Sequence, residues 1–112
     1  MIIKSYSGII NAIDKNAISK KAYFSITVDV GLFTFLLDWR QLSSYVLDNV
    51  NQDVRAIVYD YNCKNMTSEL LNEIEMSIKH TLQKDLSMYK DVKLINFQIF
   101  IYYGCNRYNL YR

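Results

Sequence analysis

The feature that most constrains this chain is the absence of proline, together with only three glycines among 112 residues. Average usage would give about five or six prolines in a chain of this length. Because proline and glycine are the residues that most often interrupt helices and strands, their scarcity predicts long regular elements with few enforced breaks. The length predicts a single compact domain over residues 1–112, large enough to bury a core without a metal or disulfide.

The charge of the chain is small in total but unevenly distributed. The net charge is +2, which does not by itself indicate a partner. Residues 38–75 carry seven acidic side chains against three basic ones, whereas residues 79–112 carry six basic against two acidic. The basic excess directs attention to the C-terminal third, although the favourable order of charges along a helix explains part of it.

The N-terminal sequence, MIIKSYSGIINAIDKN, lacks the charged start and apolar run that characterise a secretory signal. No stretch approaches the roughly 20 apolar residues of a membrane span. We therefore expect a cytoplasmic protein that does not bind membranes. Cys63 and Cys105 are then expected to be reduced, with a bridge between them as the alternative.

Hydrophobic periodicity predicts an alternation of strands and helices. Residues 2–14 read as a strand that Gly8 bends or bulges, and residues 22–39 read as a hairpin that turns at Gly31. The clearest helix covers 67–88, where Leu71, Ile74 and Ile78 recur at helical spacing and Thr67 or Asn65 can cap the start. The remaining predicted elements are a short helix at 41–50, a strand at 53–62, a strand at 94–103 and a short edge strand at 106–112.

This order, β-β-β-α-β-α-β, predicts an α+β fold. We expect a mainly antiparallel, curved sheet of five to six strands with one long amphipathic helix packed on a face. A glycine-bent strand, a hairpin, a short helix and the segment DVRAIVYDY also resemble, in order, the first four strands of an OB-fold barrel. The resemblance covers roughly residues 2–62. It implies, as the alternative, an OB-like barrel with an added helix before the last strand.

Little in the sequence points to catalysis. The chain contains no GxGxxG, GxxxxGK[ST] or HExxH motif, and its two cysteines match no zinc spacing. The single histidine, His80, lies away from the apolar stripe of its predicted helix. We expect a non-catalytic binding module that uses no metal or cofactor, although paired carboxylates near strand ends or an activated cysteine would provide for an enzyme.

The final segment, KLINFQIFIYYGCNRYNLYR, combines an alternating strand with tyrosines and arginines. Aromatic rings stack on bases and basic groups bind phosphates, and such stacking contributes roughly 1–3 kcal/mol per base. We therefore predict a single-stranded nucleic-acid binder. Its predicted contact residues are Tyr102, Arg107, Tyr108, Tyr111, Arg112 and Lys93.

Two other kinds of partner remain open. Ten tyrosines, with many asparagines and serines, suit a protein-binding surface, because tyrosine offers a large contact area with few rotatable bonds. The alternative function is thus an inhibitor or immunity protein that neutralises a cognate toxin or enzyme. A homodimer formed through an exposed edge strand is a third interpretation.

Overall fold

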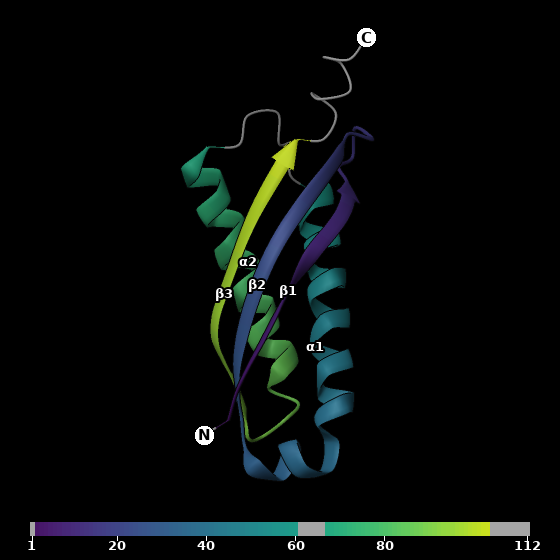
Figure 1. Cartoon of the computed structure of the whole chain (residues 1–112). Helices are drawn as coiled ribbons and strands as arrows, with labels where there is room; N and C mark the ends of the chain where they lie inside the picture. Colours follow the sequence, from purple (N-terminus) through teal and green to yellow (C-terminus); the bar gives the residue numbers. More distant parts are fainter. Residues whose placement is uncertain (1, 61–66, 104–112) are drawn as a thin grey trace.

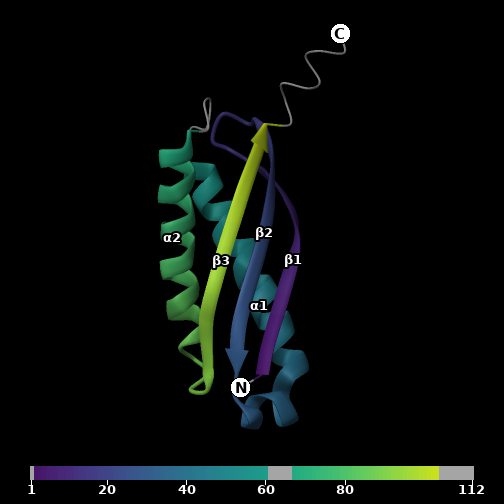
Figure 2. The same ribbon diagram turned by 60° about the vertical axis from the view of Figure 1, so that its left-hand side comes forward.

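The computed structural model describes residues 2–60 and 67–103, and it contains three strands and two helices within them (Figure 1). In chain order these are β1 (Ile2–Ile13), β2 (Ser19–Val30), α1 (Leu32–Asp60), α2 (Ser68–Leu86) and β3 (Val92–Tyr103). The strands form one antiparallel sheet in the order β1-β2-β3. Both helices cover the same side of it, α1 against β1 and α2 against β3 (Figures 1 and 2).

The prediction of five to six strands was wrong, and so was the alternative of an OB-like barrel. The described sheet has three strands, and two segments predicted as strands are helical. Residues 33–39, the expected second arm of the hairpin, begin α1, and residues 53–60 end it. The predicted short helix at 41–50 is the middle of the same element. The last part of the predicted strand at 53–62 and the edge strand at 106–112 lie outside the described residues.

A stripe of buried side chains explains why α1 is a helix over most of its 29 residues. Its members recur every fourth residue and are all almost fully buried: Leu42, Val46, Val50, Val54 and Val58. Valine favours strands in isolation, but that preference depends on context and is small beside the gain from burying a continuous helical face. The four-residue spacing of the buried residues therefore indicates the helix correctly. The β-branched composition of residues 53–62 led to the wrong prediction of a strand.

The other long elements were predicted correctly. β1, β2 and β3 lie where period-2 alternation places strands, and α2 lies within the helix predicted at 67–88. Thr67 caps that helix, because its hydroxyl oxygen accepts a hydrogen bond from the Leu70 amide at 3.1 Å. The buried residues of α2, Ile74, Ile78, Leu82 and Leu86, continue the four-residue spacing seen in α1.

Gly8 neither bends nor bulges β1, contrary to expectation. Its pairing with Phe24 is part of a regular register, and a Cβ at this position would lie 3.1 Å from the Phe24 ring. Glycine therefore lets that ring pack against the β1 backbone. The irregularity of the sheet lies instead between Thr27 and Val28 of β2. One extra residue in β3 at this point leaves Ile95 exposed rather than on the core face, where the alternation predicted it.

The start of α1 is oriented by a carboxylate from the connection between α2 and β3. Asp91 accepts hydrogen bonds from the Thr34 amide at 3.1 Å and from the Thr34 hydroxyl, and its own carbonyl accepts from the Gly31 amide at 2.7 Å. The two bonds from Thr34 hold the pKa of the Asp91 carboxyl below its ordinary range. A Cβ at Gly31 would overlap the Asp91 side chain, so only glycine leaves room for this contact.

A kink at Asp38, whose backbone is non-helical (φ −147°, ψ 19°), separates residues 32–37 from residues 39–60. In the longer part, the buried stripe of Leu42 and four valines points into the core. In the shorter part only Phe35 of the apolar residues packs partly against the core. Thr34 is buried, whereas Leu32, Phe33, Leu36 and Leu37 are exposed.

Side chains from the two helices also satisfy backbone groups along the outer strands. Arg55 of α1 donates from Nη1 to the Asn11 carbonyl of β1 at 2.7 Å. Glu75 of α2 accepts, at Oε2, from the Ile99 amide of β3 at 3.0 Å. A strand that adds to a sheet edge needs free backbone amides and carbonyls. The two bonds occupy one carbonyl of β1 and one amide of β3, so fewer of these groups are available to an edge-strand dimer.

Among the described residues, no helix is both long and apolar enough to cross a membrane.

Candidate binding surface on the open face of the sheet

None of the described elements covers the side of the sheet that faces away from both helices, and we call this side the open face (Figure 2). Strand alternation divides the side chains between the two sides. Those of Ala22, Phe24 and Ile26 lie in the core, whereas those of Lys21, Tyr23 and Ser25 point outward. Each outward residue of β2 lies between one residue of β1 and one of β3, so the open face consists of cross-strand rows.

The most apolar of these rows crosses the middle of the sheet. It contains Ile9, Tyr23 and Phe100, which are 56%, 40% and 55% exposed. The rings of Tyr23 and Phe100 have their centroids 6.5 Å apart and are tilted by 44°. This separation is typical of an aromatic pair, so the two rings support one another while keeping part of each face accessible.

Polar rows flank the aromatic row on both sides. On the side toward the end of β3 lie Asn11, Lys21 and Tyr102. On the other side lie two rows of small hydroxyl and amide residues: Ser7, Ser25 and Gln98, followed by Ser5, Thr27 and Asn96. The hydroxyls of Ser5 and Thr27 are 3.2 Å apart. The serines and the threonine of these two rows are smaller than the aromatic rings beside them.

A shallow hollow of about 440 Å³ opens beside the aromatic pair at the β3 edge. Tyr23, Ser25, Gln98 and Phe100 contribute to its wall, and Glu75 reaches it from α2. The site therefore combines two ring faces with amide, hydroxyl and carboxylate groups. These groups can exchange hydrogen bonds with a flat, polar ligand that lies against the rings.

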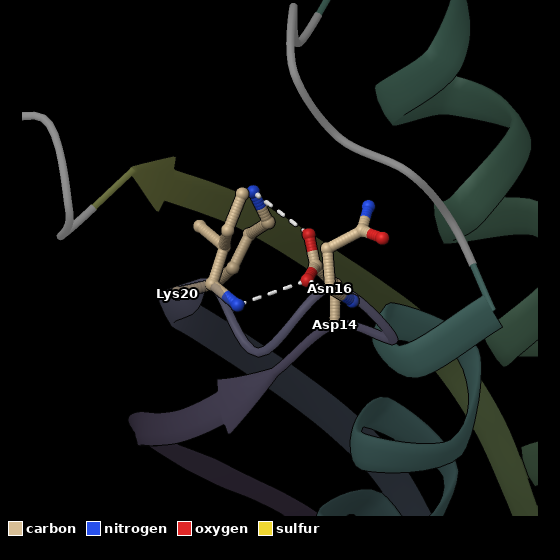
Figure 3. A network of polar contacts seen from close by, with 4 residues as sticks. Asp14, Asn16 and Lys20 are labelled. Carbon is tan, nitrogen blue, oxygen red and sulfur yellow. Dashed lines mark hydrogen bonds and ion pairs between the residues drawn. The ribbon is translucent and has the colours of Figure 1, made fainter.

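The hairpin between β1 and β2 holds a buried ion pair (Figure 3). The Lys20 ammonium lies 3.7 Å from Asp14 Oδ2, and both side chains are fully buried. Asp14 Oδ1 also accepts hydrogen bonds from the Asn16 amide at 2.8 Å and the Ile18 amide at 3.0 Å. Lys20 therefore closes the hairpin end of the core and does not contribute to the basic surface, whereas its neighbour Lys21 does.

The carboxyl groups of Asp53 on α1 and Asp85 on α2 form a pair between the helices. Burial, followed by a hydrogen bond to Asp85 and the negative charge of Asp85, raises the pKa of Asp53 to about 7. Oδ2 of each group is buried without a donor from the described residues. A proton on one carboxyl supplies that donor. The pair is thus a protonation-dependent contact between α1 and α2, on the side of the sheet opposite the open face.

The structure separates the two predicted contact residues that it describes. Tyr102 is half-buried near the end of β3 and pairs across the sheet with Lys21. Lys93 is exposed at the start of β3, opposite Asp29. At about 3.3 Å per residue, nine residues of strand place them about 30 Å apart. The other four, Arg107, Tyr108, Tyr111 and Arg112, lie outside the described residues.

Sequence reasoning missed the aromatic row. The signal was present, because Tyr23 and Phe100 each occupy the polar phase of an alternating strand, where a large ring is unusual. What was missing was the pairing of β2 with β3, which brings the two rings together. His80 is exposed on α2, as predicted. The described residues include no cluster of three or more His, Cys, Asp or Glu side chains that could hold a metal.

Comparison of the chain with known proteins adds no family assignment. No protein-family model matches the sequence, and no curated protein matches it. The geometry of the open face is therefore the main basis for a functional proposal.

Proposed function

We propose that the open face binds single-stranded nucleic acid, with bases stacked on Tyr23 and Phe100. The observation that carries the proposal is the exposed aromatic row at the centre of an uncovered sheet. Aromatic side chains accept any base, because every base has a flat π-face. The ring spacing and the tilt place two aromatic platforms side by side, which suits neighbouring bases of one strand.

The surroundings of the rings support the same ligand. Lys21 and Tyr102 form the next row, and the chain continues from β3 directly into the segment that carries Arg107 and Arg112. Phosphates would then be neutralised near the end of β3, beside the bases on the rings. Gln98 and Glu75, next to the hollow, can accept hydrogen bonds from the amino groups of bases.

Fluorescence anisotropy with labelled, mixed-sequence single-stranded DNA and RNA tests the proposal at low salt. We expect Tyr23→Ala and Phe100→Ala each to weaken binding by about 5- to 160-fold, which corresponds to the roughly 1–3 kcal/mol that one stacked base contributes. The matched control is Tyr59→Ala on α1, because that ring is 50% exposed but lies on a helix. Wild-type protein that shows no binding at low salt would end the proposal.

Two further variants separate stacking from charge. Lys21→Ala should weaken binding and make its dependence on salt shallower by about one ion, because one phosphate contact is lost. Deletion of residues 105–112 should have the larger effect of the two, because it removes two arginines and two tyrosines. If the truncated protein binds as tightly as the full chain, residues 105–112 are not part of the interface. The aromatic row would then still be tested by its own variants.

The alternative, a protein partner, is favoured by a different observation on the same face. Ile3, Ile9 and Ile13 of β1 are each about half exposed, and isoleucine neither stacks on bases nor forms hydrogen bonds. An inhibitor or immunity protein would use such residues together with Tyr23 as an apolar contact. Ile9→Ser would then reduce binding more than Lys21→Ala, and salt would have little effect. Nucleic-acid binding predicts the reverse order.

A further inference from the structure

The strongest unexplained feature outside the open face is the start of α1. Five large apolar side chains are exposed within eight residues: Leu32 (64%), Phe33 (73%), Leu36 (66%), Leu37 (70%) and Trp39 (42%). We call this group the apolar tip. It lies at the end of the molecule that also holds the start of β1 and the α2–β3 connection (Figure 1).

The tip is held in this orientation by specific contacts. Asp91 binds both the amide and the hydroxyl of Thr34, which turns the polar side of the helix inward. The Lys4 ammonium lies over the rings of Phe35 and Trp39, 5.2 Å and 5.0 Å from their centroids. The outward direction of the leucines and of Phe33 is therefore imposed by the fold.

The exposed area is large for a protein of this size. Each such side chain would gain about 1.5–3 kcal/mol if it were buried. Large aromatic side chains have areas of roughly 150–250 Å², and leucine is about as large as the lower of these values. Since the five side chains are 42–73% exposed, their exposed area adds up to several hundred Å². That exceeds a scatter of single surface residues, and it approaches the roughly 800 Å² per partner that a standard protein interface buries.

The charges around the tip indicate what covers it. Within the segment, Asp38 and Arg40 flank Trp39, so the edge of the tip carries one acidic and one basic group. Helices that lie on anionic membranes carry an excess of Lys and Arg, which this segment lacks. A two-fold interface instead requires a self-complementary surface, with both signs of charge around an apolar centre.

We propose that two copies of this chain associate through their apolar tips about a two-fold axis. Residues 32–37 of one copy pack against the same residues of the other, and Asp38 and Arg40 provide opposite charges at the rim. Because the tip belongs to the helical layer, the open face of each copy stays uncovered. The proposal is therefore independent of what the open face binds.

Sedimentation velocity tests the association over protein concentrations from about 0.1 to 100 µM, the range in which an interface of this size is expected to dissociate. We expect the wild-type chain to be a dimer at the upper end. Trp39, the only tryptophan, provides a second readout within the tip. Its emission should shift to shorter wavelength as the dimer forms, over the same concentrations.

Leu37→Glu should abolish the dimer while leaving the circular dichroism spectrum unchanged. The matched control is Met76→Glu on α2, because Met76 is equally exposed at 71% but isolated. Leu37→Ser replaces the first variant if that one does not fold. If the wild-type chain is a monomer at all concentrations, the proposal is overturned. This holds even if the tip then binds vesicles or another protein. A dimer that survives both Leu37 variants, or that Met76→Glu also disrupts, overturns it as well.

Discussion

The two parts of α1 both carry many apolar residues, five of six in residues 32–37 and eleven of 22 in residues 39–60, but they are oriented in opposite ways. Residues 39–60 direct Leu42 and the four valines of the stripe into the core, whereas residues 32–37 direct their leucines and Phe33 outward. Local hydrophobicity does not account for this difference. In the longer part, packing against β1 and α2 decides the rotation of the helix. In the shorter part, the bonds between Asp91 and Thr34 decide it, and the apolar residues are left to face solvent or a partner.

The largest predicted difference between the two parts is in their truncations. Leu42→Ala should lower the free energy of unfolding by about 2–5 kcal/mol, because it leaves a cavity in a packed core. Leu36→Ala, the matched change in the outward part, should alter it by less than about 0.5 kcal/mol. Both are measured by urea unfolding at low protein concentration, where association does not contribute. Equal losses would mean that residues 32–37 pack in the core after all.

Gly31→Ala should have an intermediate effect. The added Cβ displaces the Asp91 carboxylate, so the start of α1 loses its cap, and such losses typically cost about 1–2 kcal/mol. We also expect the Trp39 emission to change, because the displaced segment carries that residue. Gly8→Ala is the comparison: its Cβ would lie 3.1 Å from the Phe24 ring, which must shift slightly, so we expect a smaller loss and no change in the Trp39 emission. An unchanged Gly31→Ala protein would show that Asp91 does not orient the tip.

The smallest effect concerns Asp53, on the inward side of the longer part. Its pKa is about 7 in the folded protein against an ordinary 3.8, so the folded state binds more protons than the unfolded state between these values. The free energy of unfolding therefore falls as pH rises through this window, and the loss is complete above about pH 7. Because solvent partly screens the group, we expect a loss on the order of 1 kcal/mol.

Asp53→Asn should remove this pH dependence. The variant should be more stable than wild type at pH 8 and nearly equal to it at pH 4, because the amide supplies a donor to Asp85 at every pH. Asp48→Asn is the control, since Asp48 is exposed on the same helix. Urea unfolding at both pH values provides the measurement. A wild-type stability that rises from pH 4 to pH 8 through Asp53 would contradict the assignment of the raised pKa.

The sheet shows a second limit of reasoning from sequence. Alternation along β2 predicted correctly that Tyr23 and Ser25 share the outward side. It did not predict how few strands the sheet has, because five to six were expected. The helical state of residues 32–60 removes two of the predicted strands, and the described sheet has three.

The sequence by itself determined those properties that depend on residues close together in the chain. The lack of proline requires long elements, period-2 alternation specifies β1, β2 and β3, and Thr67 caps a helix with a four-residue apolar spacing. Only the tertiary structure decided that the valine-rich segment is helical, that Tyr23 meets Phe100, and that the apolar tip points outward. Each of these depends on contacts between residues distant in the chain, and the energy of such contacts exceeds the small intrinsic preferences of single residues.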